Sequence, residues 1–172
     1  ADLLQLNTSK PIPDLSADAR IWTTPPRILV LDQSDGRLQS VTDSGAQVLD
    51  LKGCTIPPKS NLAVGSGDTY DYIGQLRIAQ DGTTECLSKT IGNPSDTIST
   101  TLSDGSIIVR STSDEGKTFS FRYISANGST KIDLPEKSVP GAHGHHLVYS
   151  TSADGVATVT AFSEKDLKPS GS

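Results

Sequence analysis

The stretch 107–121, IIVRSTSDEGKTFSF, carries two incompatible signals, and deciding between them decides the fold class. Its Gly-Lys-Thr at 116–118 could end a phosphate-binding loop, which needs a glycine five positions earlier and a helix afterwards. Position 111 is a serine, and the following residues, TFSFRYIS, place Phe119, Phe121 and Tyr123 at alternate positions. A period of two is typical of a β-strand. The stretch therefore indicates two strands joined by a turn and argues against a nucleotide-binding loop.

Short β-prone runs separated by turn residues dominate the chain, and no convincing apolar helical period is present. Four pairs of runs flank an Asp-Gly: 27–32 with 37–41, 70–79 with 84–89, 97–102 with 106–111, and 146–151 with 156–163. Glycine adopts the positive φ that tight hairpins require. We therefore expect an all-β, antiparallel, hairpin-rich fold without a helix.

The spacing of the Asp-Gly pairs indicates blades. Asp35 and Asp81 are 46 residues apart, and Asp104 and Asp154 are 50 apart, close to the period of propeller blades. Asp81 and Asp104 are only 23 apart, a hairpin-to-hairpin distance within one sheet. About eleven or twelve strands can be drawn, enough for about three four-stranded blades. We expect propeller-like blades, with a β-sandwich as the alternative.

Residues 112–119 resemble the Asp-box, Ser/Thr-x-Asp-x-Gly-x-Thr-Trp/Phe, of sialidase-like β-propellers. The matching residues are Thr112, Asp114, Gly116, Thr118 and Phe119. The resemblance implies a hairpin whose aspartate accepts hydrogen bonds from backbone N–H groups and whose aromatic residue tucks into the sheet. In that family the box is structural, so it implies a blade and carries no activity.

The same resemblance implies an alternative, a fragment or subunit of a sialidase-like glycoside hydrolase. Such a site uses three arginines against a substrate carboxylate, a Tyr–Glu pair and an aspartic acid. The candidates by residue type are Arg27, Arg77, Arg110, Arg122, Tyr70, Tyr72 and Glu85. Only Arg27 stands where the family's first arginine would, and no motif assigns the rest. We therefore expect no catalytic residues here and favour a chain that is not an enzyme.

The segment GSGDTYDY, residues 65–72, is the main binding candidate. It combines Asp68, Tyr70, Asp71 and Tyr72, and loops with aromatic and carboxylate groups can bind sugars or proteins. The alternative is a loop that enters a strand, with the tyrosines in the core or at its rim. Trp22 is a further binding candidate, and it could also pin an N-terminal arm onto the domain.

We expect three regions: a proline-punctuated N-terminal arm over 1–26, a single β domain over 27–164 and a C-terminal tail over 165–172. Cys54 and Cys86 are the only cysteines. A disulfide between them would close a loop of about 30 residues and contribute roughly 3–4 kcal/mol; two buried free thiols are the alternative. A disulfide, and a chain that begins Ala-Asp without methionine, favour an extracellular or periplasmic location.

The composition restricts the partners. The net charge is −5 and the basic residues are scattered, which argues against a nucleic-acid surface. No apolar run approaches the roughly 18 residues of a membrane span. His143 and His145 could share one face of a strand beside His146, but no third ligand is marked, so we expect a loop and no metal or cofactor. The sequence predicts a secreted or periplasmic, non-enzymatic recognition domain that binds a protein or a glycan through its loops, of the inhibitor or immunity, adhesin or lectin type. It leaves a homo-oligomer open.

Overall fold

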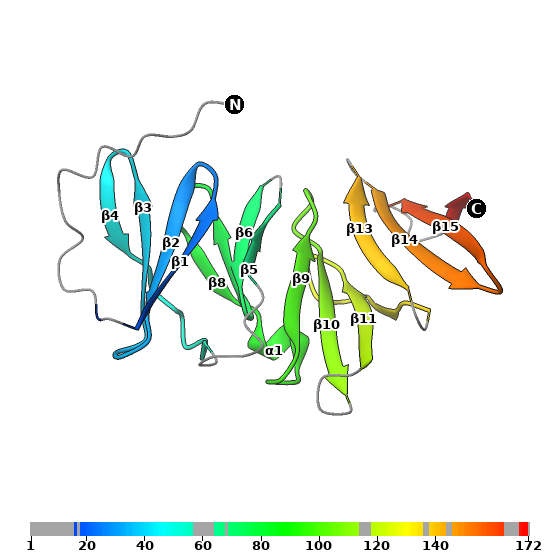
Figure 1. Ribbon diagram of the computed structural model, residues 1–172, viewed down its shortest axis with the longest axis horizontal. Helices are drawn as coiled ribbons and strands as arrows, with labels where there is room; N and C mark the ends of the chain where they lie inside the picture. The colour runs from blue at the N-terminus through cyan, green and yellow to red at the C-terminus, as the bar shows by residue number, and fades with distance from the viewer. Residues whose placement is uncertain are drawn as a thin grey trace. The chain divides into compact units, whose positions relative to one another are not determined.

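The computed structural model describes residues 16, 18–56, 64–67, 69–113, 118–135, 138–143, 146–163 and 169–171. In these residues sixteen strands form four separate four-stranded antiparallel sheets, with one short helix (Figure 1). Each sheet takes its strands consecutively from the chain, so within a sheet every strand pairs with the next one. The all-β, antiparallel prediction is confirmed, although more strands form than the sequence indicated. No helix in this part of the chain is long and apolar enough to cross a membrane.

The four sheets follow one another along the chain. The first contains β1 (Ala19–Thr24), β2 (Arg27–Asp32), β3 (Arg37–Thr42) and β4 (Gly45–Val48). The second contains β5 (Val64–Ser66), β6 (Tyr70–Ile73), β7 (Leu76–Ala79) and β8 (Thr84–Cys86). After α1 (Ser88–Ile91), the third contains β9 (Thr97–Thr101), β10 (Ile107–Ser113), β11 (Thr118–Ile124) and β12 (Lys131–Asp133). The fourth contains β13 (Val139–His143), β14 (His146–Ala153), β15 (Val156–Ser163) and β16 (Pro169–Gly171).

The chain divides into two compact units, residues 1–50 and 51–172, and each is described by itself. The first unit holds the first sheet. Part of the expected N-terminal arm belongs to this sheet, because residues 19–24 form β1 and pair with β2 across the two-residue turn at Pro25 and Pro26. At the other end, residues 169–171 of the expected tail form β16. The prolines of this segment led us to expect an irregular arm and to miss the hairpin turn at 25–26, because proline is common in turns as well as in irregular segments.

Three hairpin turns share one geometry. They are the turns 79–82, 102–105 and 125–128. In each, the glycine N–H donates to the carbonyl oxygen three residues earlier at 2.8–3.0 Å, and the glycine has φ between +71° and +88°. The Asp or Asn before the glycine accepts the N–H two residues further on at 2.7–3.0 Å. This is a type I turn followed by a left-handed residue. The Asn127–Gly128 turn is an addition to the predicted Asp-Gly hairpins.

The third sheet is buried on both faces around Ile107, Ile108 and Val109. One core cluster contains Tyr72, Leu87, Ile91, Ile98, Ile107, Val109 and Ile124, and so joins the second sheet, α1 and one face of the third sheet. A second cluster contains Leu102, Ile108, Tyr123 and Leu134, with Phe121 and Ile132 packed against it. Ile107 pairs with Ile124 and Ile108 with Tyr123, which places the two clusters on opposite faces. In a two-layer sandwich each sheet has one face in the core and one in solvent. A sheet with both faces buried therefore favours an arrangement in which sheets pack one after another. Propeller-like blades stay a prediction.

Two local predictions in the second sheet were wrong. The run 70–79 is not one strand, because Gly74 and Gln75 form a two-residue turn between β6 and β7. Gly74 has φ +62° at the first turn position, where a type II′ turn takes glycine. The run 84–89 ends as a strand at Cys86, and α1 follows until Gly92, whose φ of +87° terminates the helix.

Candidate functional site

The predicted disulfide between Cys54 and Cys86 is confirmed, with their Cα atoms 5.4 Å apart. It ties the segment before β5 to the end of β8 within the second unit. Cys54 is buried, and the Ser88 hydroxyl lies 3.0 Å from Cys86 Sγ. The bridge therefore fixes the backbone at Cys54, and with it the neighbouring Thr55.

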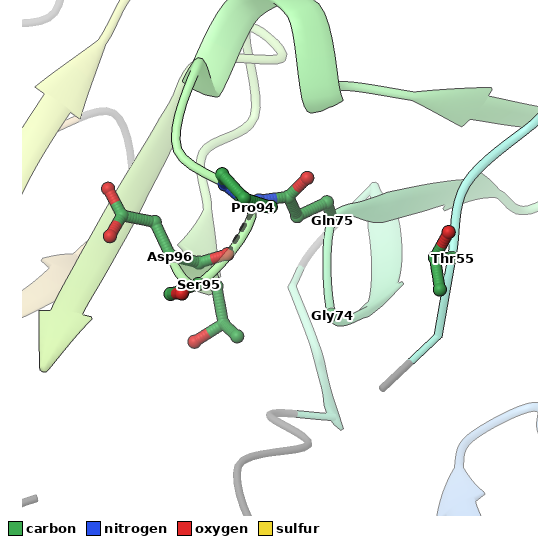
Figure 2. A pocket seen from close by; sticks show the side chains of 7 residues that line it. Thr55, Gly74, Gln75, Pro94, Ser95 and Asp96 are labelled. Atoms are coloured by element: carbon green, nitrogen blue, oxygen red, sulfur yellow. Dashed lines mark hydrogen bonds between the residues drawn. The ribbon is translucent and has the colours of Figure 1, made fainter. Parts of the chain in front are cut away.

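Thr55 forms one wall of a pocket of about 190 Å³ (Figure 2). The lining residues are Thr55, Gly74, Gln75, Pro94, Ser95, Asp96 and Thr97. They come from three places in the chain: the segment after Cys54, the β6–β7 turn, and the loop that leads into β9. Four of the seven side chains carry a hydroxyl or an amide group, although apolar atoms provide most of the exposed surface of the pocket.

Gln75 holds the turn and the loop together. Its Nε2 donates to the carbonyl oxygens of Asn93 and Asp96, both at 2.7 Å, and the latter bond is drawn in Figure 2. The side chain is buried, and the Gly74 carbonyl oxygen accepts the N–H of Ile98 at 2.9 Å. Buried polar groups that are fully bonded fix local geometry. These hydrogen bonds therefore hold two of the pocket's three walls, the β6–β7 turn and the loop before β9, in a fixed arrangement.

Asp96 is the only ionisable residue among the seven that line the pocket. Its carboxylate is 3 % exposed and accepts hydrogen bonds from Asn93 Nδ2 at 2.9 Å and from Arg122 at 3.3 Å. Arg122 also donates to the carbonyl oxygen of Ile91 at 3.2 Å. The negative charge is therefore paired, and the lining supplies no second carboxyl for acid–base hydrolysis.

The arginines proposed for a substrate carboxylate do not converge within the second unit. Arg110 pairs with Phe121 and Arg122 with Val109, so these two arginines lie on opposite faces of the β10–β11 hairpin. Arg77 pairs with Glu85 at 2.6 Å. Arg27 is buried in the first unit.

Arg77 does bring two other candidates together. Its guanidinium lies 4.6 Å from the centroid of the Tyr70 ring, pairs with Glu85 and also donates to the carbonyl oxygen of Gly105. The arginine thus links the second sheet to the β9–β10 turn. The Arg77 guanidinium already has Glu85 and the Gly105 carbonyl oxygen as partners, so this cluster has a structural role and is a poor candidate for binding a substrate carboxylate.

Most of the segment GSGDTYDY lies in strands β5 and β6, and several of its side chains are buried instead of being presented on a loop. Tyr72 is 8 % exposed and donates to the carbonyl oxygen of Ser99. Burial raises the pKa of Tyr72, and the nearby charge of Arg110 opposes that rise. A Cβ at Gly65 would lie 2.6 Å from Cζ of Tyr72, which explains a glycine at that position. Asp71 is also buried, Tyr70 is half-buried, and Asp68 lies outside the described residues.

The predicted Asp-box falls on a hairpin, where β10 pairs with β11 from Ile107–Ile124 to Ser113–Thr118. Thr112 pairs with Phe119, whereas Asp114 and Gly116 lie outside the described residues. The expectation that the aromatic residue tucks into the sheet was wrong, because Phe119 is 51 % exposed. The Arg110 guanidinium lies 5.2 Å from its ring centroid.

The other candidates are placed as follows. Trp22 is half-buried in β1 opposite Leu29. His143 pairs with His146 through the backbone, and His145 lies outside the described residues. Among the residues that the structure describes, no group of three His, Cys, Asp or Glu side chains could hold a metal ion.

Sequence reasoning missed the pocket. Its signals were an isolated glycine within a strand pattern, at Gly74, and the turn-forming run Asn-Pro-Ser-Asp at 93–96. Neither reveals that the two segments meet, because they are far apart in the chain. Comparisons with protein-family models, with curated proteins and with solved structures found no match for this chain.

Proposed function

We propose that this chain is a secreted or periplasmic, non-enzymatic recognition domain that binds a glycan or a protein partner through its loops. The observation that carries the proposal is the pocket beside the disulfide. Its ionisable residue is already paired, and its other polar groups are neutral. Such a lining is suited to binding rather than to proton transfer.

The chemistry of the lining favours a hydroxyl-rich ligand. Thr55, Ser95 and Thr97 each carry a hydroxyl, which can both donate and accept hydrogen bonds. A volume of about 190 Å³ is smaller than the ~300–1,000 Å³ of pockets for drug-sized molecules. One small group, such as a terminal sugar residue or a polar side chain, is therefore the expected occupant.

The disulfide supports the location. Stable disulfides form in oxidising compartments such as the extracellular space and the periplasm. The bridge also borders the pocket through Thr55, so an oxidising compartment would keep the proposed site assembled.

The first experiment is a glycan array probed with the intact, labelled chain. We expect selective binding that the double variant Thr55→Val, Ser95→Ala weakens by about tenfold or more, because a neutral hydrogen bond contributes about 1 kcal/mol. Thr158→Val on the exposed strand β15 is the matched control and should bind like the original chain. Equal binding by the double variant would exclude this pocket as the site.

Two further outcomes bear on the class of protein. Cleavage of any bound glycan would overturn the non-enzymatic proposal and favour the hydrolase alternative. A folded chain that binds no glycan would move the proposal to a protein partner, which a pull-down with the same variants would then test.

A further inference from the structure

The β10–β11 hairpin extends beyond its sheet. The neighbouring strand β9 pairs with β10 only from Ile107 to Arg110, and β12 pairs with β11 only from Arg122 to Ile124. Among the residues that the structure describes, no strand flanks 111–113 or 118–120 on the outer side of the hairpin. The exposure of Phe119 agrees with this, since no described strand next to it supplies side chains that cover its ring.

Arg110 and Phe119 form a pair on one face of this hairpin, next to half-buried Phe121. The guanidinium of Arg110 lies 5.2 Å from the ring centroid of Phe119, and Phe121 is directly opposite Arg110 in the register. Arginine and aromatic residues are enriched in protein interfaces and at their hot spots. The cation–π contact also holds the long arginine side chain in place, which reduces the entropy lost on binding.

The charge of Arg110 is not balanced within the described part of the unit. Arg77 and Arg122 each have a carboxylate, from Glu85 at 2.6 Å and Asp96 at 3.3 Å. The structure describes no such carboxylate for Arg110, although the protein as a whole has a net charge of −5. The Nε–H groups of all three arginines are buried without an acceptor. Of these three arginines in the described residues, Arg110 is the one that lies against an exposed aromatic ring and has no described carboxylate partner.

We propose that Arg110 and Phe119 form a docking surface for a protein partner that presents an Asp or Glu carboxylate next to an apolar side chain. A guanidinium binds a carboxylate through two parallel hydrogen bonds, and the Phe119 ring offers apolar area to the neighbouring side chain. This surface is separate from the pocket, because Arg122, which pairs with Asp96, lies on the opposite face of the hairpin.

The test uses an array of end-blocked nonapeptides with a central Glu-Leu, Glu-Phe, Asp-Leu or Asp-Phe pair, each beside its Gln or Asn counterpart. We expect the intact chain to prefer the acidic peptides. Arg110→Gln and Phe119→Ser should each weaken binding by about tenfold. Arg110→Lys should keep only part of the binding, since lysine keeps the positive charge but lacks the planar pair of N–H donors that binds both carboxylate oxygens.

Lys89→Gln is the matched control, because it removes one exposed positive charge elsewhere in the same unit. Equal losses in Lys89→Gln and Arg110→Gln would overturn the proposal, as would equal binding of Gln-containing and Glu-containing peptides. Binding of acidic glycans through Arg110, with no acidic peptide bound, would overturn the choice of a protein partner. The pocket variants leave Arg110 and Phe119 intact, so the two proposals can fail separately.

Discussion

The third and fourth sheets use the same turn signal and yet differ in burial. Asp104–Gly105 connects β9 to β10, and Asp154–Gly155 connects β14 to β15. Three consecutive residues of β10, Ile107, Ile108 and Val109, are at most 2 % exposed. In β15, residues 156–159 are all exposed, with Val156 at 64 % and Val159 at 55 %. Hairpin formation is therefore a local property, whereas burial depends on what the sheet faces contact.

The largest expected effect tests this contrast in the core. Ile108→Ala should lower the free energy of unfolding of the second unit by about 2–5 kcal/mol, because it leaves a cavity in a fully buried cluster. Val159→Ala should cost less than about 1 kcal/mol, since its side chain is already largely solvated. Urea unfolding with hydrogen exchange of the third and fourth sheets measures both. Similar losses would mean that the two sheets are equally packed.

The disulfide should matter next. The double variant Cys54→Ala, Cys86→Ala opens a loop with a sequence separation of 32 and should cost about 2–4 kcal/mol. The loss should appear in hydrogen exchange of the second sheet and of α1. Fluorescence of Trp22, the only tryptophan, reports on the first unit and should keep its urea midpoint. An unchanged exchange pattern in the second sheet would contradict a stabilising role for the bridge.

The turn glycines provide a smaller, matched pair. Gly155→Ala should cost about 1 kcal/mol, because its φ is +77° but open space surrounds a Cβ. Gly105→Ala should cost about 2 kcal/mol, because its φ is +87° and a Cβ would lie 3.1 Å from Nη1 of Arg77. The difference in urea midpoint between the two variants measures the contact with Arg77. Equal costs would mean that Arg77 moves aside freely.

The smallest effect concerns pH and the β2–β3 turn. Hydrogen bonds from Ser16 and Ser34 hold the pKa of Asp32 well below its usual range. Because the pKa of Asp32 is lower in the folded state, the Asp32 carboxylate contributes its full stabilisation at pH values above the unfolded-state pKa of about 3.9. That stabilisation is lost as the pH falls from this value toward the folded-state pKa. We expect the urea midpoint from Trp22 fluorescence to fall between pH 5 and pH 2.

Asp32→Asn should flatten this pH dependence at the cost of a lower midpoint at neutral pH. Asp43→Asn, which removes an exposed carboxylate from the β3–β4 turn of the same sheet, is the control and should keep the slope. A slope that persists in Asp32→Asn would assign the acid sensitivity to other carboxylates.

Candidate sites were harder to predict than the fold. Tyr72 and Asp71 have the residue types of a binding loop, but the register of β6 places them in the interior. Arg110 and Arg122 look equivalent in the sequence, and only their pairing with Phe121 and Val109 assigns them to opposite faces. Residue type specifies what a group can do, whereas its neighbours determine whether it is available.

By itself, the sequence predicted the class of fold and the Asp-Gly hairpins, and it favoured a disulfide between Cys54 and Cys86 over two free thiols, which the structure then confirmed. Turns are local, because a side-chain oxygen of Asp or Asn accepts the backbone N–H two residues further on and glycine supplies the positive φ. The tertiary structure alone decided that Gly74 and Gln75 meet the 93–97 loop to form a pocket, and that Asp96 pairs with Arg122. Those relations join residues 18 or more positions apart, which only packing brings together.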